Sequence, residues 1–403
     1  MRSRTSRSGG DVLQDAQNFS LVLGGPLYQL LCRTHLSDDA MMHLRQRVIV
    51  IALIGWLPLL LLSALHGDLL GQHIAVPFLK DLEVHIRFLA AVPLLIAAEL
   101  VVHRRLNRVA LGFLDRNLIP EAALSRFDEA LSAAYRLRNS LPAELLLLVV
   151  VYGVGIQIVW RHFTALDAAT WYATPTAEGS KLLPAGIWYS YLSLPLFQFL
   201  LLRWYFRLFI WVQFLWRVSK IELSLVPTHP DRVGGLGFLS RTAHAFSVLL
   251  LAHGAMVAAQ LANRILYLGE SLPQFQGEIA VMVVFLLCVV FGPLLVFTPQ
   301  LAKAKRAGLF EYGSLAERYV REFDVKWVHG GGPRSEELVG SADIQSLADL
   351  DSSYDIVRTM RAALIDRQAL IQLAVAVLLP IAPLLLTVMP LEALLKKLLG
   401  VLF

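Results

Sequence analysis

Charged residues are scarce in this sequence. Asp, Glu, Lys and Arg make up 17% of the 403 residues, whereas soluble domains usually contain about a quarter. The hydrophobic residues, at 56%, gather in unbroken leucine-rich runs and not in the short alternating segments of a membrane barrel. Because lipid offers the backbone no hydrogen bonds, such runs indicate helices that cross a lipid bilayer. We therefore expect an all-α fold, a polytopic transmembrane helical bundle.

Cysteine and the common catalytic motifs are also nearly absent. Cys32 and Cys288 are the two cysteines, which excludes a disulfide framework and provides no metal-ligand spacing. The glycines at 234–237 are not followed by the Lys-Ser/Thr of a P-loop, and neither Gly-x-Ser-x-Gly nor His-Glu-x-x-His occurs. We therefore predict no catalytic residue, no metal and no cofactor. The net charge of +5 comes from basic residues beside apolar runs, so membrane topology explains it and no nucleic-acid partner is expected.

About seven segments are apolar enough to span a bilayer, which takes about 20 residues each. They are Val48–Leu65, Phe88–Val102, Leu145–Trp160, Ile187–Arg207, Ala245–Leu268, Ile279–Thr298 and Leu370–Met389. Arginine and lysine gather before the first segment and after the second, fourth and sixth. Since basic loops stay in the cytoplasm, this alternation predicts seven spans and a cytoplasmic N-terminus.

The first two regions of the chain follow from these spans. Residues 1–47 form a cytoplasmic N-terminal segment, in which Phe19–Leu36 is expected to be an interfacial or re-entrant helix. Residues 48–300 form a transmembrane bundle of six spans. This bundle includes a cytoplasmic helical hairpin near 107–140, because apolar residues recur there at helical spacing on both sides of Pro120.

Two further regions complete the chain. Residues 301–369 form a cytoplasmic helical region that continues the sixth span, breaks at 329–333 and resumes with Ser341 as a helix N-cap. Residues 370–403 contain the last span and an amphipathic C-terminal tail, which lies outside or folds back into the interface.

The fifth span carries polar residues on one stripe. His253, Gln260 and Arg264 lie at i, i+7 and i+11, on one side of a helix. Polar side chains at membrane depth face a bundle interior or water, so they either line a path for a solute or serve helix packing, which is the favoured interpretation for His253. Glu99 and Glu144 fall near the cytoplasmic ends of their spans and are expected at the interface.

Small residues follow a neighbouring stripe of the same span. Gly254, Ala258 and Ala262 recur at four-residue steps, a pattern that lets another helix approach closely. In the fourth span, Arg203 and Arg207 lie one turn apart on one face. Snorkelling to the interface within an aromatic belt is the favoured explanation of these arginines, and a cationic lining of the path is the alternative.

The loop after the fourth span combines titratable side chains with glycines. Its candidate site residues are His229, Asp231, Arg232, Gly234, Gly235 and Gly237. Such a loop can bind an anion, a metal or a protein partner. Its glycines permit positive φ or close backbone approach. The favoured interpretation is a rigid elbow in which Asp231 caps backbone amides.

Two segments carry a family resemblance. Thr228–Leu239 and Gly340–Leu350 resemble signature segments of an uncharacterised family of bacterial polytopic inner-membrane proteins, and residues 379–403 are similar as well. These segments cover a small part of the chain. The resemblance implies a multi-pass protein of the bacterial inner (plasma) membrane, and it implies no catalytic residue.

The leading hypothesis is a channel or transporter, acting alone or as a homo-oligomer, with His253, Gln260, Arg264, Arg203 and Arg207 along its path. A first alternative is a non-transporting scaffold or sensor that docks a cytoplasmic protein partner on the loop at 229–237 and on 302–367. A second is a lipid-modifying membrane enzyme, which would depend on His229, Asp231 and Arg232. An enzyme is less favoured than a non-enzyme because no motif names a reaction.

Overall fold

The structure, a computed structural model, is a bundle of long helices. It describes residues 9–33, 44–71, 74–155, 170–176, 179–331 and 340–388. Within these residues the strands are β1 (Ala173–Thr176) and β2 (Gly179–Leu182), which pair antiparallel as a short hairpin. The predicted fold class, an all-α polytopic helical bundle, is confirmed.

Among the described residues, six helical runs are long and apolar enough to cross a membrane. They are Leu44–His66, Leu82–Asp115, Pro184–Val218, Gly237–Leu268, Leu272–Val328 and Arg367–Thr387. The pair Glu121–Arg138 and Leu141–Gly155, bent by 48°, makes a seventh if it counts as one span. Each run contains the described part of one predicted segment except Val388, which follows the last run. Residues 156–160 of the third segment and Met389 lie outside the described residues. The protein is therefore a multi-pass membrane protein.

The first half of the chain contains short helices, one long helix and one composite run. The elements before the second run are α1 (Gly9–Gln17), α2 (Pro26–Arg33), α3 (Leu44–His66) and η1 (Phe78–Lys80). The second run joins α4 (Leu82–Ile86), the π-helical η2 (Arg87–Ala91), α5 (Val92–Leu106) and α6 (Val109–Asp115). The bent pair consists of η3 (Glu121–Ala123), α7 (Leu124–Arg138) and α8 (Leu141–Val150), and a π-helical turn continues α8 to Gly155. Two helices, α6 and α7, fall in the region near 107–140 for which a cytoplasmic helical hairpin is predicted.

The second half is built from composite runs. The fourth run joins α9 (Pro184–Trp188), the π-helical η5 (Tyr189–Ser193) and α10 (Leu194–Val218). The fifth joins α11 (Gly237–Ser240), η6 (Arg241–Phe246) and α12 (Ser247–Leu268). The sixth joins η7 (Leu272–Phe275), α13 (Gln276–Phe291), η8 (Gly292–Phe297), α14 (Thr298–Phe323) and η9 (Asp324–Val328). The last elements are α15 (Ala342–Arg358), α16 (Arg367–Leu378) and η10 (Leu379–Thr387).

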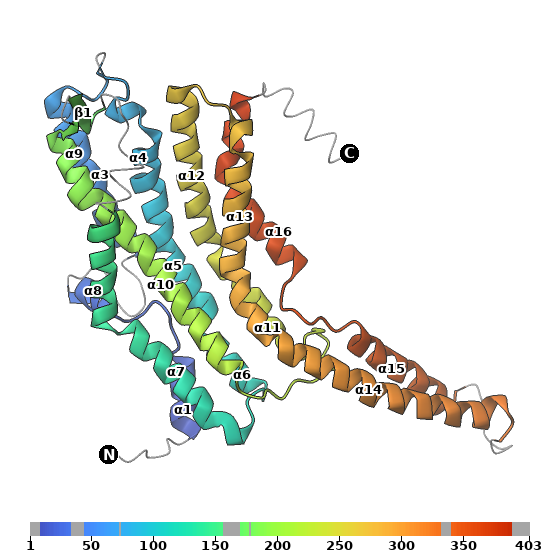
Figure 1. Ribbon diagram of the computed structural model, residues 1–403. Helices are drawn as coiled ribbons and strands as arrows, with labels where there is room; N and C mark the ends of the chain where they lie inside the picture. The colour runs from blue at the N-terminus through green and yellow to red at the C-terminus, as the bar shows by residue number, and fades with distance from the viewer. Residues whose placement is uncertain are drawn as a thin grey trace.

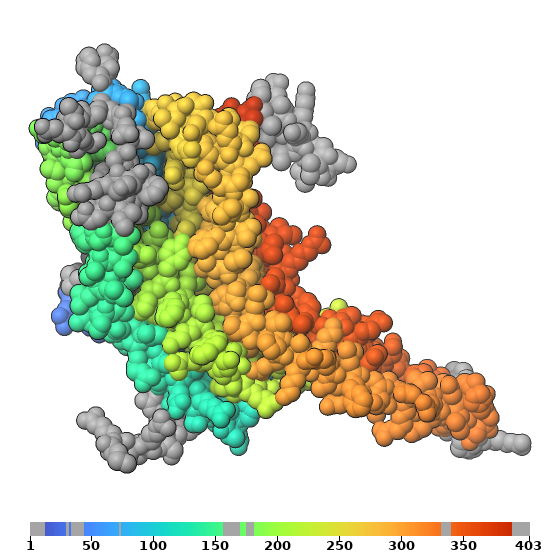
Figure 2. Space-filling model, viewed as in Figure 1, coloured from blue at the N-terminus to red at the C-terminus, as the bar shows by residue number. Residues whose placement is uncertain are grey.

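The two ends of the bundle differ. The β1–β2 hairpin lies at one end, here called the hairpin end, and α1, α6 and α7 lie at the other, here called the arm end (Figure 1). At the arm end α14 leaves the bundle and α15 packs along it, so the two helices form an arm that projects from the molecule (Figures 1 and 2). The predicted helical extension of the sixth span is this α14. Ser341 caps α15 as predicted, because its side chain accepts the Asp343 N–H at 3.1 Å.

Close helix contact is confirmed for the small-residue stripe of α12. A Cβ added to Gly254 would stand 2.1 Å from the carbonyl oxygen of Val377 on α16, so the two backbones touch there. Ala258 and Ala262 are buried on the same helix. Glycine is required at 254 because any side chain would push the helices apart.

Candidate functional site

Five charged side chains form a buried cluster, here called the charge cluster, where α3, α5, α8 and α10 meet. They are Arg47, Glu99, Glu144, Arg203 and Arg207, each no more than 7% exposed. Glu99 pairs with Arg47 and with Arg207, whose Nη2 lies 2.7 Å from Glu99 Oε1. Arg203 stands between two carboxylates, with Nη1 3.8 Å from Glu99 Oε1 and Nε 3.4 Å from Glu144 Oε1. The cluster thus holds three guanidinium groups and two carboxylates.

The local sequence explains how Glu144 reaches this cluster. Ser140 caps α8 and places Glu144 in its first turn. The second carboxylate oxygen of Glu144 accepts the Leu27 N–H at 2.8 Å, at the start of α2. Gly25 has φ +93°, and a Cβ there would lie 2.9 Å from a backbone carbonyl of Arg138. The N-terminal segment can therefore approach the cluster closely only because this residue is glycine.

One interpretation of these residues is wrong. Arg203 and Arg207 do not snorkel to an interface, because their side chains are 7% and 5% exposed and paired with carboxylates. The depth of Glu99 and Glu144 near the cytoplasmic ends of their spans stays a prediction, but their side chains are buried among the helices as the partners of those arginines. Sequence reasoning also missed Arg47, which directly precedes the first predicted span. The signal for Glu99 was present, since a carboxylate inside an apolar run is costly without a partner.

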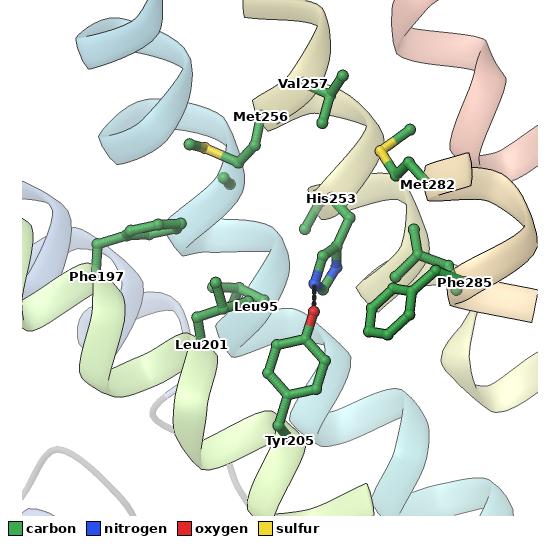
Figure 3. A pocket seen from close by; sticks show the side chains of 12 residues that line it. Leu95, Phe197, Leu201, Tyr205, His253, Met256, Val257, Met282 and Phe285 are labelled. Atoms are coloured by element: carbon green, nitrogen blue, oxygen red, sulfur yellow. Dashed lines mark hydrogen bonds between the residues drawn. The ribbon is translucent and has the colours of Figure 1, made fainter. Parts of the chain in front are cut away.

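An apolar pocket of about 260 Å³ lies between α5, α10, α12 and α13. Leu201 and Tyr205 line it from α10. Leu201 is two positions from Arg203, and Tyr205 is two positions from both Arg203 and Arg207, a step of about 200° that points them to nearly the opposite side of the helix. Figure 3 shows the side chains of Met256 and Phe285 around this space. Helix α10 therefore carries the charge cluster on one face and the pocket on the other.

His253 and Tyr205 form the polar part of the pocket wall. The Tyr205 hydroxyl lies 2.9 Å from His253 Nε2 and points toward it (Figure 3). His253 Nδ1 lies 2.8 Å from the carbonyl oxygen of Leu249, to which it must donate. The neutral imidazole then accepts a hydrogen bond from the Tyr205 hydroxyl at Nε2, so both ring nitrogens have a hydrogen-bond partner. This arrangement agrees with the packing interpretation of His253 and also places its ring beside the pocket.

A second buried polar cluster, here called the outer cluster, lies toward the hairpin end. Asp81 caps α4 and accepts hydrogen bonds from Trp171 Nε1 at 2.9 Å and from Asn263 Nδ2 at 2.8 Å. Arg87 is buried and bonded to Glu83 and to the Tyr189 hydroxyl. Arg87 and Tyr189 both lie in π-helical segments, which occur often at functional sites.

The two clusters and the pocket follow one another along α5 and η2. Arg87 and Glu99 are twelve residues apart, which corresponds to about 18 Å of helix. Ala91 and Leu95, which line the pocket, fall between them. The order along this run is therefore outer cluster, apolar pocket and charge cluster.

The structure does not gather all the predicted path residues in one place. Of the fifth-span stripe, His253 lines the pocket, whereas Gln260 is exposed on the surface of α12. Arg264 pairs with Glu270, at 2.6 Å between Nε and Oε2, and stacks on the Phe275 ring. Arg203 and Arg207 lie together in the charge cluster, away from this stripe.

The loop at 229–237 forms an elbow around Asp231. Its carboxylate accepts backbone N–H groups from Val233 at 2.9 Å, Gly235 at 3.1 Å and Gly237 at 2.8 Å. Burial alone would raise the pKa of Asp231, but these three donors and the nearby His229 outweigh it and hold that pKa below its ordinary value. The carboxylate is thus engaged by the loop itself, as the elbow interpretation expects.

The backbone of this loop ties two parts of the protein together. Arg232 and Gly234 have φ of +56° and +65°. The Arg232 carbonyl accepts the Arg361 N–H at 2.8 Å, between α15 and α16. A loop so connected serves as a junction between the bundle and the arm.

The described residues contain no group of three or more His, Cys, Asp or Glu side chains placed to hold a metal ion. No family model matches this sequence, and neither a curated protein nor a solved structure is similar to it.

Proposed function

We propose that this protein is a membrane transporter whose substrate occupies the apolar pocket. The observation that carries the proposal is the order along α5 and η2, where a buried polar cluster lies on each side of the pocket. In a transporter these clusters would close the pocket toward one side of the membrane or the other. An open channel would instead require a continuous polar path.

The charge cluster supports a mechanism in which the membrane-spanning helices move. Charges buried in membrane-spanning helices are costly, and apolar residues could hold a static bundle equally well. Arg203 lies 3.8 Å from Glu99 and 3.4 Å from Glu144, farther than a good hydrogen bond from either. A guanidinium shared between two carboxylates can tighten on one and release the other as helices shift, which provides the two states that transport needs.

The pocket wall indicates the class of substrate. It consists of aliphatic, aromatic and methionine side chains together with the hydrogen-bonded pair of Tyr205 and His253. Phe285 at its edge is 52% exposed, so the pocket reaches the side of the bundle that would face lipid. An apolar or amphipathic molecule that enters from the bilayer fits these walls better than an ion does.

The orientation and location belong to the same proposal. Basic residues are abundant in the loops of the arm end, which the positive-inside rule places in the cytoplasm together with the N-terminus. The resemblance of Thr228–Leu239 and Gly340–Leu350 to a bacterial family supports the inner (plasma) membrane as its location.

The test is transport of a fluorescent short-chain phospholipid in proteoliposomes, with dithionite bleaching the probe in the outer leaflet. The wild type should move the probe at least about fivefold faster than empty vesicles. Met256→Trp, which fills the pocket, should return the rate to that of empty vesicles. Leu266→Trp is the matched control on the same helix, because Leu266 is 61% exposed. Equal rates in the wild type and Met256→Trp would refute the proposal.

The arm favours a second candidate, a scaffold or sensor that docks a cytoplasmic protein. Phe310 on α14 is 77% exposed, and Val325 and Val328 farther along are 60% and 65% exposed. Exposed apolar side chains on a projecting helix pair are typical of protein contacts. A photo-crosslinker at position 310 in cells should then give one discrete adduct, and one at Arg306 on the same helix should not. The same crosslinked adducts from positions 310 and 306 would exclude specific docking at Phe310.

A further inference from the structure

A second pocket, of about 380 Å³, opens at the arm end where α5 and α6 meet α11 and η6. We call it the basic pocket. Charged side chains dominate its wall, and they are Arg105, Arg108, Arg116, Arg241 and Asp115. Arg105 lies in α5, Arg108 and Arg116 lie in the turns before and after α6, and Arg241 lies in η6. Two segments that are remote in sequence therefore converge to make this wall, which distinguishes it from a run of charge on one helix face.

Packing fixes the shape of the basic pocket. The Arg116 guanidinium lies 4.4 Å from the ring centre of Phe238 and donates to the Gly235 carbonyl at 3.2 Å. Gly112 lets α6 approach the same ring, since a Cβ there would stand 3.1 Å from Phe238. Thr242 is buried at its edge and is held by a hydrogen bond to the Leu239 carbonyl at 2.6 Å. Arg116, the Phe238 ring and Thr242 are thus held in position by the protein itself before any ligand binds.

Positive charge in this pocket exceeds its negative charge. Asp115 is the acidic residue in the wall. Among ion pairs within 4.0 Å between described residues, none involves Arg105, Arg108, Arg116 or Arg241. An anion would therefore be attracted to the pocket without having to displace a described carboxylate from these arginines.

We propose that the basic pocket binds a phosphate group. Arginine presents a planar fork of N–H donors that matches phosphate oxygens, and several forks converge here. The pocket begins where the apolar part of α5 ends at Val102, which is the depth of lipid headgroups in a membrane-spanning helix. Basic pockets at this depth between spanning helices bind phosphorylated headgroups. The phosphate belongs to an anionic lipid or to a free phosphate compound, and the experiment below separates these sources.

The experiment measures binding of phosphatidylglycerol to the full-length protein in detergent by native mass spectrometry. The pocket variant Arg108→Gln/Arg241→Gln should bind this lipid at least about tenfold more weakly, because two charge-assisted contacts are lost. The control variant Arg306→Gln/Arg318→Gln removes the same charge from exposed positions on α14 and should change affinity less than about twofold. Both pairs are exposed, so the variants should fold like the wild type.

Titration with inorganic phosphate identifies the source. If phosphate at millimolar concentration displaces the lipid from the wild type, the pocket recognises the phosphate alone. If phosphate does not compete and the pocket variant still loses the lipid, the ligand is the lipid headgroup. Equal weakening in the pocket and control variants, or no weakening in the pocket variant, would overturn the assignment, because binding would then come from general surface charge.

Discussion

Arg207 on α10 and Glu99 on α5 form a buried ion pair, with Nη2 and Oε1 2.7 Å apart and side chains 5% and 6% exposed. Arg47 shares the same carboxylate from α3. Water does not screen a pair this deeply buried, so its partners depend on each other much more than in a surface pair. One carboxylate thus links three helices that are remote in sequence.

Replacing Glu99 with glutamine should destabilise the protein strongly. The substitution keeps the shape of the side chain but leaves Arg47 and Arg207 without their shared negative charge. Removing one partner of a buried pair typically costs about 3–5 kcal/mol. The measurement is the apparent unfolding temperature in detergent, which should fall clearly below that of the wild type.

Glu222→Gln is the matched control for this substitution. Glu222 pairs with Lys303 at 2.7 Å, but the two side chains are 84% and 74% exposed. Exposed pairs contribute little, so no measurable change in the unfolding temperature is expected. Equal shifts in Glu99→Gln and Glu222→Gln would show that the charge cluster does not hold the helices together.

Asp231 should make stability depend on pH. Its pKa is lower in the folded protein than its ordinary value of about 3.9. Its contribution is therefore present above the unfolded pKa and is lost as pH falls through the folded pKa. Asp231→Asn should cost about 1 kcal/mol at neutral pH, because the three N–H donors lose a charged acceptor. Unfolding curves from pH 7 to pH 3 should show the difference from the wild type shrinking below about pH 4.

Asp351→Asn on the exposed face of α15 provides the control for this prediction. It removes the same charge without touching a backbone donor of the loop, so its curve should follow that of the wild type. A difference between Asp231→Asn and the wild type that stays constant from pH 7 to pH 3 would contradict the role of the ionised carboxylate.

Run length and residue spacing were sufficient to predict much of the fold. The requirement that a spanning helix be long and apolar is local, so the described part of each predicted span lies in a helix, apart from Val388 at the end of the last one. The cap at Ser341 and the contact stripe at Gly254 also depend on a few neighbouring residues. Such features are visible in one sequence because the physical cause lies within one or two helical turns.

The charge cluster could not be derived in this way. Arg203 and Arg207 clearly share a face, but the sequence does not tell which helix that face meets. Their partner Glu99 lies more than a hundred positions earlier, and hydrophobic periodicity within α5 says nothing about α10. The same limit applies to the pocket, since its walls come from four helices whose order around the bundle is a tertiary property.

Gly254→Ala should separate α12 from α16. Because the new Cβ would stand 2.1 Å from the Val377 carbonyl oxygen, the helices must move apart or distort. Overpacking of this kind costs about 1–3 kcal/mol and should lower the apparent unfolding temperature. Gly277→Ala on α13 is the control, because its Cβ would meet open space among the described residues, and it should be neutral or slightly stabilising. Similar behaviour of the two variants would contradict the close contact of α12 with α16.

The hydrogen bond between Tyr205 and His253 separates a structural from a functional role for the pocket wall. Tyr205→Phe removes the donor to Nε2 and leaves that nitrogen unpaired among apolar side chains, which should cost about 1–3 kcal/mol. Replacing both partners, as Tyr205→Phe/His253→Leu, removes the unpaired group as well and should recover much of the lost unfolding temperature.

The double variant then becomes informative in the proteoliposome assay. If the pair serves packing alone, a restored unfolding temperature should come with a wild-type rate of lipid movement. If the pair orients the polar part of an amphipathic substrate, the double variant should be stable and yet transport the probe several-fold more slowly. We expect the second result, because the Tyr205 hydroxyl donates its proton to His253 and keeps an oxygen that can accept a hydrogen bond from a substrate in an otherwise apolar wall.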